Sequence, residues 1–273
     1  MRGSRRLDGL FAAVSEYSSA YQAYSTRGVN STLNTADREW AGEEPWRVPH
    51  YFAVGEDALG LIVAALISTG RSSPQRILDF PSGSGRVTRH LRAFFPDAEI
   101  WVSDVYEEHL TFCAEQFGVK TTLSVEDFTS LSFDVEFDLI FCGSLLTHVP
   151  LTSARAALGA ISRALGPTGI AMVTFHGRHS SHVQRNKWKY VDDELFHVAE
   201  DQADATGFGF VEYRGAMRDR FSARSSYGMS LIRPSWPIAQ LEADPNVRIL
   251  GCSERAWDDH QDVVVFGRPG IDD

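Results

Sequence analysis

The stretch "RILDFPSGSGRVTRHL", residues 76–91, decides the fold of this chain of 273 residues. An apolar run ends at Asp79, two glycines separated by one residue follow at Gly83 and Gly85, and a basic segment of helical character completes the stretch. A strand, a tight glycine loop and a helix in this order typically offer backbone N–H groups to a nucleotide. The sequence therefore predicts a nucleotide-type ligand at this loop.

The residues that follow Arg76 alternate between short apolar runs and helical segments. The apolar runs are "RILDF", "EIWVSDV", "KTTLSV", "FDLIFCG" and "GIAMVTFH". Near-continuous β-rich runs between helices predict an α/β fold, in which helices cover both faces of a parallel sheet. Two late runs, "YGMSLIRP" and "QDVVVFGRP", are predicted to add a closing antiparallel pair.

Two regions depart from this alternation. Residues 1–75 contain two helical patterns, "LFAAVSEYSSAYQAYS" and "EDALGLIVAALIS", on either side of a polar loop, and we expect them to form an N-terminal helical lid. Residues 178–219 are polar and aromatic. We expect residues 76–273 to form one α/β domain that carries this second region as a C-terminal insertion.

The composition of the chain argues against two classes of binding partner, nucleic acids and membranes. A formal net charge of −10 without a long Lys/Arg run argues against nucleic-acid binding, because phosphate neutralisation needs a basic face. The longest apolar stretch, residues 58–67, is too short to span a bilayer, and no signal-peptide pattern is present, so we expect no membrane partner. Three widely spaced cysteines, Cys113, Cys142 and Cys252, suggest neither a disulfide framework nor a cysteine metal site, and a reducing cytoplasm is expected.

Charge at the glycine loop indicates which nucleotide binds. A dinucleotide fingerprint needs a third glycine, but Thr88 occupies that place, and Asp79 would repel a pyrophosphate. S-adenosylmethionine carries an ammonium and a sulfonium and no phosphate, so a carboxylate suits it. Asp104 ends the next apolar run, at about the spacing at which an acidic side chain reaches ribose hydroxyls.

On these residues the sequence resembles the class I S-adenosylmethionine-dependent methyltransferases, over roughly residues 55–180. The pieces that match in order are "LDFPSGSGR", "VSDV", "SVEDF", "FDLIFCGSLLTHV" and "LGPTGIAMVTF". The resemblance implies a Rossmann-like, doubly wound sheet of order 3-2-1-4-5-7-6 with strand 7 antiparallel. Residues 76–273 would then be the methyltransferase domain. The tail resembles a bacterial branch often associated with glycosyltransferases, through "TFHGR", "YGMSLIRPSW" and "ERAWDDHQDVVVF".

The resemblance also implies a set of residues that bind S-adenosylmethionine. Pro81 stands where the family usually has glycine, and it fixes φ and removes an N–H. Asp127 and Phe128 are expected to contact adenine, although a capping role and the neighbouring Glu126 are alternatives. The complete predicted set is Asp79, Pro81, Gly83, Gly85, Arg86, Asp104, Val105, Asp127, Phe128, Cys142, Gly143 and Ser144.

Three histidines are candidates for the general base: His260, His176 and His148. His260 precedes the last predicted strand, and Asp258, Asp259 or Asp262 is expected to orient its imidazole, as a carboxylate does in a catalytic triad. His176 and His148 follow predicted strands at the end where α/β folds bind ligands. Five aromatic residues are predicted either to line an acceptor pocket or to pack in the core or lid. They are Tyr51, Phe52, Trp188, Tyr190 and Tyr227.

The spacing of His176, His179 and His182 invites a metal site, since imidazole is a common zinc ligand. No local carboxylate or cysteine joins them, so no metal is expected.

The function predicted from these features is methyl transfer from S-adenosylmethionine to an oxygen of a small acceptor, such as a sugar or a glycosylated or polyketide-like natural product. Transfer to nitrogen or carbon and a non-catalytic cofactor-binding module are alternatives. A nicotinamide-dependent oxidoreductase is disfavoured by Asp79 and by the missing third glycine. The residues alone fix neither the acceptor nor the oligomeric state.

Overall fold

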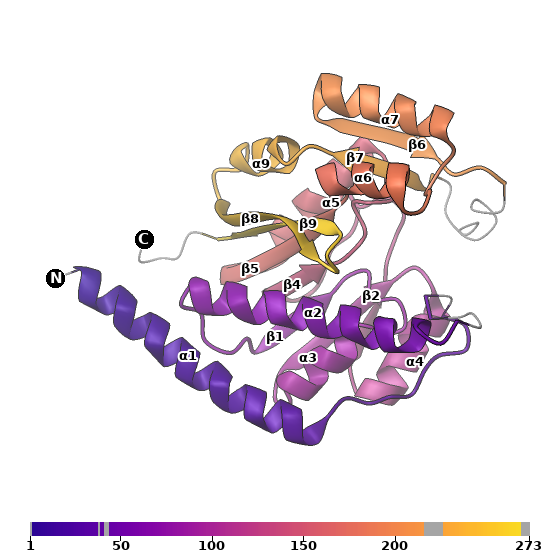
Figure 1. Ribbon diagram of the computed structural model, residues 1–273. Coiled ribbons are helices and arrows are strands. Elements are labelled where there is room, and N and C mark those ends of the chain that lie inside the picture. The colour runs from indigo at the N-terminus through magenta and orange to yellow at the C-terminus, as the bar shows by residue number, and fades with distance from the viewer. Residues whose placement is uncertain (1, 38, 41–43, 216–225, 269–273) are drawn as a thin grey trace. The chain divides into compact units, whose positions relative to one another are not determined.

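The computed structural model describes residues 2–37, 39–40, 44–215 and 226–268, and Figure 1 shows their helices and strands. The helices are α1 Arg2–Arg27, α2 Arg47–Ser68, α3 Thr88–Phe94, α4 Glu107–Phe117, α5 Leu151–Ala164, α6 Arg178–Asn186, α7 Asp193–Thr206 and α9 Ser235–Glu242. The strands are β1 Arg76–Asp79, β2 Glu99–Asp104, β3 Lys120–Leu123, β4 Phe137–Cys142, β5 Leu165–Phe175, β6 Phe208–Glu212, β7 Gly228–Ile232, β8 Arg248–Trp257 and β9 Gln261–Gly267.

Seven strands form one sheet in the order β3-β2-β1-β4-β5-β9-β8. Strand β1 pairs in parallel with β2 and β4, whereas β9 runs antiparallel to both β5 and β8. Within this sheet β8 and β9 are the sixth and seventh strands along the chain. The order 3-2-1-4-5-7-6 with an antiparallel strand 7 is therefore confirmed.

The predicted pairing of the two late apolar runs is wrong. The "YGMSLIRP" run forms β7, which pairs with β6 in a separate two-stranded sheet, and β8 is the strand that pairs with β9 beside it. Strand β8 lies at the sheet edge and is exposed over residues 252–255, so it lacks the apolar pattern that marks a buried strand. Strand β7 is buried at all five positions, which explains its apolar sequence.

The chain divides into two compact units, each described here by itself. Unit 1 comprises residues 1–124 and 137–141, and unit 2 comprises residues 125–136 and 142–273. Unit 1 contains the glycine loop, and unit 2 contains the candidate histidines. The lid role of residues 1–75 and the predicted domain boundaries stay predictions.

Helix α2 belongs to the core of unit 1. It is long and apolar enough to cross a membrane by length and composition, but Ala58, Ile62 and Leu66 form a fully buried face along it. It packs against α1 and α3, and Figure 1 shows α1 and α2 side by side. At Gly55 a Cβ atom would lie 2.2 Å from the carbonyl oxygen of Arg86, so only glycine permits this approach. Packing accounts for the apolar character of α2.

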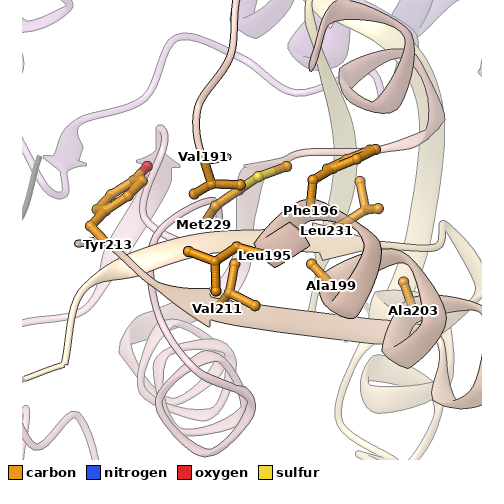
Figure 2. Packing of buried hydrophobic residues seen from close by; sticks show 9 residues of the cluster. All are labelled: Val191, Leu195, Phe196, Ala199, Ala203, Val211, Tyr213, Met229 and Leu231. Atoms are coloured by element: carbon orange, nitrogen blue, oxygen red, sulfur yellow. The ribbon is translucent and has the colours of Figure 1, made fainter. Parts of the chain in front are cut away.

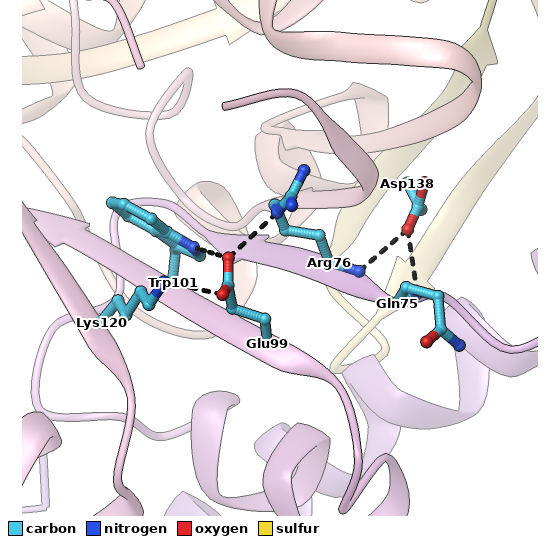
Figure 3. A network of polar contacts seen from close by, with 6 residues as sticks. All are labelled: Gln75, Arg76, Glu99, Trp101, Lys120 and Asp138. Carbon is cyan, nitrogen blue, oxygen red and sulfur yellow. Dashed lines mark hydrogen bonds and ion pairs between the residues drawn. The ribbon is translucent and has the colours of Figure 1, made fainter. Parts of the chain in front are cut away.

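A polar network joins the amino ends of neighbouring strands in unit 1 (Figure 3). The Glu99 carboxylate accepts hydrogen bonds from Lys120 Nζ at 2.7 Å, Trp101 Nε1 at 2.9 Å and Arg76 Nε at 3.0 Å, which lower its pKa to about 2. Asp138 accepts the backbone N–H of Arg76. The network therefore lies at the opposite end of these strands from Asp79 and Asp104.

Unit 2 contains an apolar core in which α7 packs on β6 and β7 (Figure 2). At Gly209 a Cβ atom would lie 1.8 Å from the carbonyl oxygen of Ala199, so the helix rests directly on the strand. The buried cluster comprises Val191, Leu195, Phe196, Ala199, Ala203, Val211, Tyr213, Met229 and Leu231. This packing fixes the place of β7 within unit 2.

Candidate functional site

The glycine loop of unit 1 is tied to the end of β2. The chain leaves β1 through a cis bond between Phe80 and Pro81. The backbone N–H of Ser82 then donates to the carbonyl of Ser103 at 3.0 Å, and that of Gly83 donates to Asp104 Oδ2 at 2.9 Å. The loop and the second predicted anchor therefore form one assembly.

The two glycines of the loop serve different needs. Both have positive φ, +52° at Gly83 and +77° at Gly85. A Cβ atom on Gly83 would meet nothing within 4 Å, whereas one on Gly85 would lie 2.4 Å from the Phe117 ring and 3.1 Å from Cys113 Sγ. Gly83 is required only for its backbone conformation, and Gly85 is required for close packing as well.

Asp79 is a buried carboxyl group at the end of β1. Its side chain is 1% exposed and accepts a hydrogen bond from Thr88 Oγ1 at 2.6 Å. Burial raises its pKa to about 7, and the neighbouring Asp104 acts in the same direction, whereas the bond from Thr88 opposes the change. A cation placed beside this carboxyl group would lower its pKa and restore its negative charge.

Asp104 ends β2 with both carboxylate oxygens occupied by backbone donors. Oδ2 accepts from Gly83, and Oδ1 accepts from the N–H of Tyr106 at 3.1 Å. The residue is 5% exposed, and Val105 follows it. Its position at the end of the strand next to β1 matches the position predicted from the sequence, and its role toward a ribose stays a prediction.

A buried arginine links the glycine loop to the segment between α1 and α2. Arg89 is 1% exposed and donates to the carbonyl oxygens of Gly85 at 3.1 Å and Thr32 at 3.0 Å. Asn34 Nδ2 donates to Ser84 Oγ at 3.0 Å. Sequence reasoning missed this link, because backbone carbonyl acceptors leave no pattern in a sequence.

Arg86 lies among residues of the same segment. Its guanidinium carbon is 5.9 Å from the centre of the Tyr51 ring, and its Nη1 is 3.9 Å from Glu39 Oε2. The Tyr51 hydroxyl donates to Asp37 Oδ2 at 2.9 Å. Tyr51 is therefore packed in unit 1, the second of the two roles considered for it, and Arg86 remains a predicted cofactor residue.

In unit 2 the turn after β4 is held by three side chains. Cys142 and Gly143 are buried, and Ser144 has a positive φ of 57°. The N–H of Ser144 donates to Thr174 Oγ1 at 2.8 Å, which donates to Gln261 Oε1 at 2.6 Å. Gln261 Nε2 returns a bond to Ser144 Oγ at 2.7 Å. This closed ring of bonds joins the turn after β4 to β5 and β9.

Asp127 and Phe128 lie in the segment between β3 and β4. Asp127 is exposed, and its Oδ1 accepts from the N–H of Thr129 at 3.0 Å and from Thr129 Oγ1 at 2.6 Å, which lower its pKa. These contacts close a turn and cap no helix, since residues 124–136 contain none. Phe128 is 1% exposed. Adenine contact by these residues stays a prediction.

The three candidate histidines come together in unit 2. The ring centres of His176 and His148 are 6.1 Å apart, those of His176 and His260 are 5.4 Å apart, and both pairs meet edge to face. Tyr190 lies 4.9 Å from His176, and Tyr227 stacks on His148 at 4.7 Å. Five residues that are far apart in the sequence therefore form one cluster of imidazoles and phenols.

The hydrogen-bond partner of the His260 ring is a phenol, and the Trp188 ring stacks on it at 5.8 Å. His260 Nε2 is 2.5 Å from the Tyr190 hydroxyl, and burial lowers the pKa of His260 to about 4. Asp262 Oδ1 instead accepts the N–H of Arg255 at 2.8 Å, and Asp259 Oδ2 accepts from Arg255 Nη2 at 2.5 Å. Tyr190 therefore takes the orienting place that was expected for Asp259 or Asp262, because the β8–β9 turn directs both carboxylates to Arg255. For Asp258, the third carboxylate considered, that role stays a prediction.

The other two histidines of the spaced motif lie on α6. The rings of His179 and His182 stack at 5.6 Å, and Asn186 Nδ2 lies 3.2 Å from His182 Nδ1. Within the described ranges, no three His, Cys, Asp or Glu side chains are grouped so as to hold a metal ion. The absence of a metal stays a prediction, tested below.

Comparison with known proteins finds a family match over part of the chain. Residues 77–169 match the model of a methyltransferase domain. Among solved structures, the chain is similar to a S-adenosylmethionine-dependent methyltransferase from Clostridium acetobutylicum ATCC 824, with 14% identity, a TM-score of 0.51, and coverage of 79% of this chain and 92% of that one.

Two further solved structures are similar. The glycopeptide N-methyltransferase MtfA is 11% identical with a TM-score of 0.49, over 84% of this chain and all of the other. Streptomyces venezuelae DesVI is 15% identical with a TM-score of 0.49, over 80% of this chain and 92% of the other. No curated protein matches the chain in sequence.

The matched residues contain the glycine loop, Asp104 and the turn after β4. The sheet order with its antiparallel seventh strand is the order that the resemblance implied. Residues 77–169 therefore match a methyltransferase domain, and the chain has the fold of the S-adenosylmethionine-dependent methyltransferases.

Proposed function

We propose that this chain is an S-adenosylmethionine-dependent methyltransferase that transfers the methyl group of this cofactor to a hydroxyl oxygen of a small acceptor, such as a sugar or a glycosylated or polyketide-like natural product. The observation that carries the proposal is the cluster of His148, His176 and His260 with Tyr190 and Tyr227. Imidazoles and phenols donate and accept hydrogen bonds without a fixed charge, which suits a neutral hydroxyl-bearing acceptor.

The residues of unit 1 fit the cofactor. S-adenosylmethionine, when bound, supplies an electrophilic methyl group on a positively charged sulfur. Each carboxylate oxygen of Asp104, a residue that is 5% exposed, accepts one backbone N–H and keeps a second lone pair, and these two lone pairs suit the two ribose hydroxyls. Asp79 is a buried carboxyl group that gains its charge beside a cation. Pro81, Gly83, Gly85, Arg86 and Val105 complete the predicted contacts of this unit.

Proton removal supports oxygen as the acceptor atom. A hydroxyl is a poor nucleophile near neutral pH, and removal of its proton by a positioned base is typically worth about 10² to 10⁴ in rate. Burial lowers the pKa of both His176 and His260 below the ordinary value of a histidine. Both rings are therefore neutral at physiological pH and able to accept a proton.

The test is transfer of an isotope-labelled methyl group to a panel of acceptors: monosaccharides, glycosylated polyketides, phenols, amines and an activated carbon acid. We expect labelled ether products, identified by mass spectrometry, and formation of S-adenosylhomocysteine in step with them. Labelled amine or carbon products without any ether would overturn the choice of oxygen. The Asp104→Ala variant serves as the control for cofactor-dependent transfer.

Chelation is expected to leave methyl transfer unchanged. The proposed chemistry needs no Lewis acid, and His179 and His182 of the spaced motif lie on α6 with each other and Asn186 as neighbours. Initial rates should agree within error after treatment with EDTA and removal of the chelator. Loss of activity that zinc or magnesium restores would show that a metal takes part.

We further propose that the enzyme works in a reducing cytoplasm. Its three cysteines are all free thiols, Cys113 and Cys142 are buried, and Cys252 is exposed. These observations support a compartment in which thiols stay reduced.

A further inference from the structure

Strand β7, which follows the predicted insertion of residues 178–219, is hydrogen-bonded along one edge to two segments that carry candidate histidines. The N–H of Gly228 donates to the carbonyl of His148 at 2.9 Å, and the N–H of Ile232 donates to the carbonyl of His176 at 2.8 Å. Between them, the N–H of Ser230 donates to Thr147 at 2.8 Å. The strand therefore fixes the backbone on which both imidazoles stand.

The carbonyl groups of the same edge contact the imidazole rings. The Gly228 oxygen lies 3.1 Å from His148 Nδ1, and the Ser230 oxygen lies 3.2 Å from His176 Nδ1. His148 Nδ1 also lies 3.1 Å from the Tyr213 hydroxyl, which can donate to it, but the partner of His176 Nδ1 is a carbonyl oxygen, which only accepts, so this Nδ1 carries the proton. In a neutral imidazole the lone pair is then on Nε2. Residues two apart on a strand point their carbonyls the same way, which is why one edge of β7 contacts both rings.

The bonding of His260 differs from that of His176. The Tyr190 hydroxyl lies 2.5 Å from His260 Nε2, and burial raises the pKa of Tyr190, so the phenol stays protonated and shares a hydrogen bond with this nitrogen. His260 Nε2 is therefore already engaged in a hydrogen bond. His176 makes hydrogen bonds to the described residues through Nδ1 and its backbone carbonyl, and none of them uses Nε2.

We propose that His176, with its tautomer set by the Ser230 carbonyl of β7, is the general base of the reaction, and that His260 is held by Tyr190 in a supporting role. This inference rests on the proposed function. As the acceptor oxygen bonds to the methyl carbon, the carbon–sulfur bond breaks and its electron pair stays on sulfur. The hydroxyl proton moves to His176 Nε2. The positive charge thus passes from the sulfonium to an imidazolium, whose Nδ1–H remains bonded to Ser230.

The surroundings of His176 keep it neutral before the reaction. The ring is 3% exposed, and burial, His260 and His148 all lower its pKa, whereas the bond to Ser230 acts in the opposite direction. The phenol of Tyr190 packs 4.9 Å away on the insertion side. The rate is therefore expected to stay level from pH 8 to below the ordinary histidine pKa, and to fall only at lower pH.

The tautomer can be tested without an acceptor. Long-range ¹H–¹⁵N spectra of histidine-labelled protein at pH 7.5 should show His176 with a protonated Nδ1 and an unprotonated Nε2, the signal being assigned by its loss in His176→Gln. A protonated Nε2 on His176 would overturn the proposal.

Kinetics of three variants test the role. His176→Gln is expected to lower kcat by about 10² to 10⁴ and to remove the acidic limb of the pH profile, with the Kd for S-adenosylhomocysteine within twofold of wild type. His260→Gln and Tyr190→Phe should lower kcat less than tenfold and keep the limb. The opposite pattern, with the limb lost in His260→Gln and kept in His176→Gln, would overturn the assignment.

These outcomes are separable from the failure of the proposed function. If wild-type enzyme methylates amines and no hydroxyls, oxygen transfer is wrong, and the same three variants are assayed on the amine. The loss of the limb in His176→Gln alone would then still support His176 as the proton acceptor, and its retention there would reject it.

Discussion

Asp104→Ala is expected to weaken S-adenosylhomocysteine binding by about 100-fold or more. Two charge-assisted hydrogen bonds to ribose hydroxyls, at about 1.5 kcal/mol each, amount to about 3 kcal/mol, and tenfold in Kd corresponds to about 1.4 kcal/mol. The variant also removes the acceptor that holds the N–H of Gly83 at 2.9 Å. Both effects act on the cofactor loop, and titration calorimetry measures their sum.

Two controls sharpen this measurement. Asp104→Asn keeps the shape and one acceptor oxygen, so it should weaken binding by roughly tenfold. Asp97→Ala removes an exposed carboxylate in the turn before β2 and should leave the Kd within twofold of wild type. A Kd for Asp104→Ala within threefold of wild type would remove Asp104 from the ribose.

Gly85→Ala is expected to lower the free energy of unfolding by about 3 kcal/mol, whereas Gly83→Ala should lower it by about 1 kcal/mol. Both positions carry the cost of a left-handed residue, about 1 kcal/mol. Only the Gly85 substitution adds a clash, with the Phe117 ring 2.4 Å from the new Cβ, and overpacking of this kind costs about 1 to 3 kcal/mol. Urea denaturation of both variants measures the difference.

A double variant separates the clash from the backbone conformation. Gly85→Ala combined with Phe117→Leu should be destabilised by less than the sum of the two single changes, because the smaller side chain gives way to the Cβ. Equal losses at Gly83 and Gly85, or strict additivity of the double variant, would show that contact with Phe117 is not the cause.

The central strands were predictable because they are buried on both faces and read as continuous apolar runs, as "RILDF" and "FDLIFCG" do. The end of α4 was predictable for a local reason, since Gly118 adopts φ +61° at its C-cap. Strand β8 was not, because an exposed edge strand lacks that pattern. The pairing of β7 with β6 depends on packing against α7, which no local signal encodes.

The candidate site divides in the same way. Asp79, Gly83, Gly85 and Asp104 follow strand ends, so their placement came from local sequence. The histidine cluster depends on residues 148, 176, 190, 227 and 260, which only tertiary structure brings together. The contacts of Arg89 with Thr32 and of His176 with Ser230 involve backbone oxygens. Every residue has such an oxygen, so no residue type in the sequence predicts these contacts.

The use of carbonyl oxygens along β7 has a consequence for how this enzyme can diverge. The two imidazoles contact main-chain carbonyl oxygens, those of Gly228 and Ser230, and a point substitution does not delete a main-chain oxygen. Descendants of this chain can replace side chains near these rings and so change which acceptor they prefer. The main-chain contacts that orient the rings are kept through such replacements. Acceptor range and proton chemistry are thereby free to evolve at different rates.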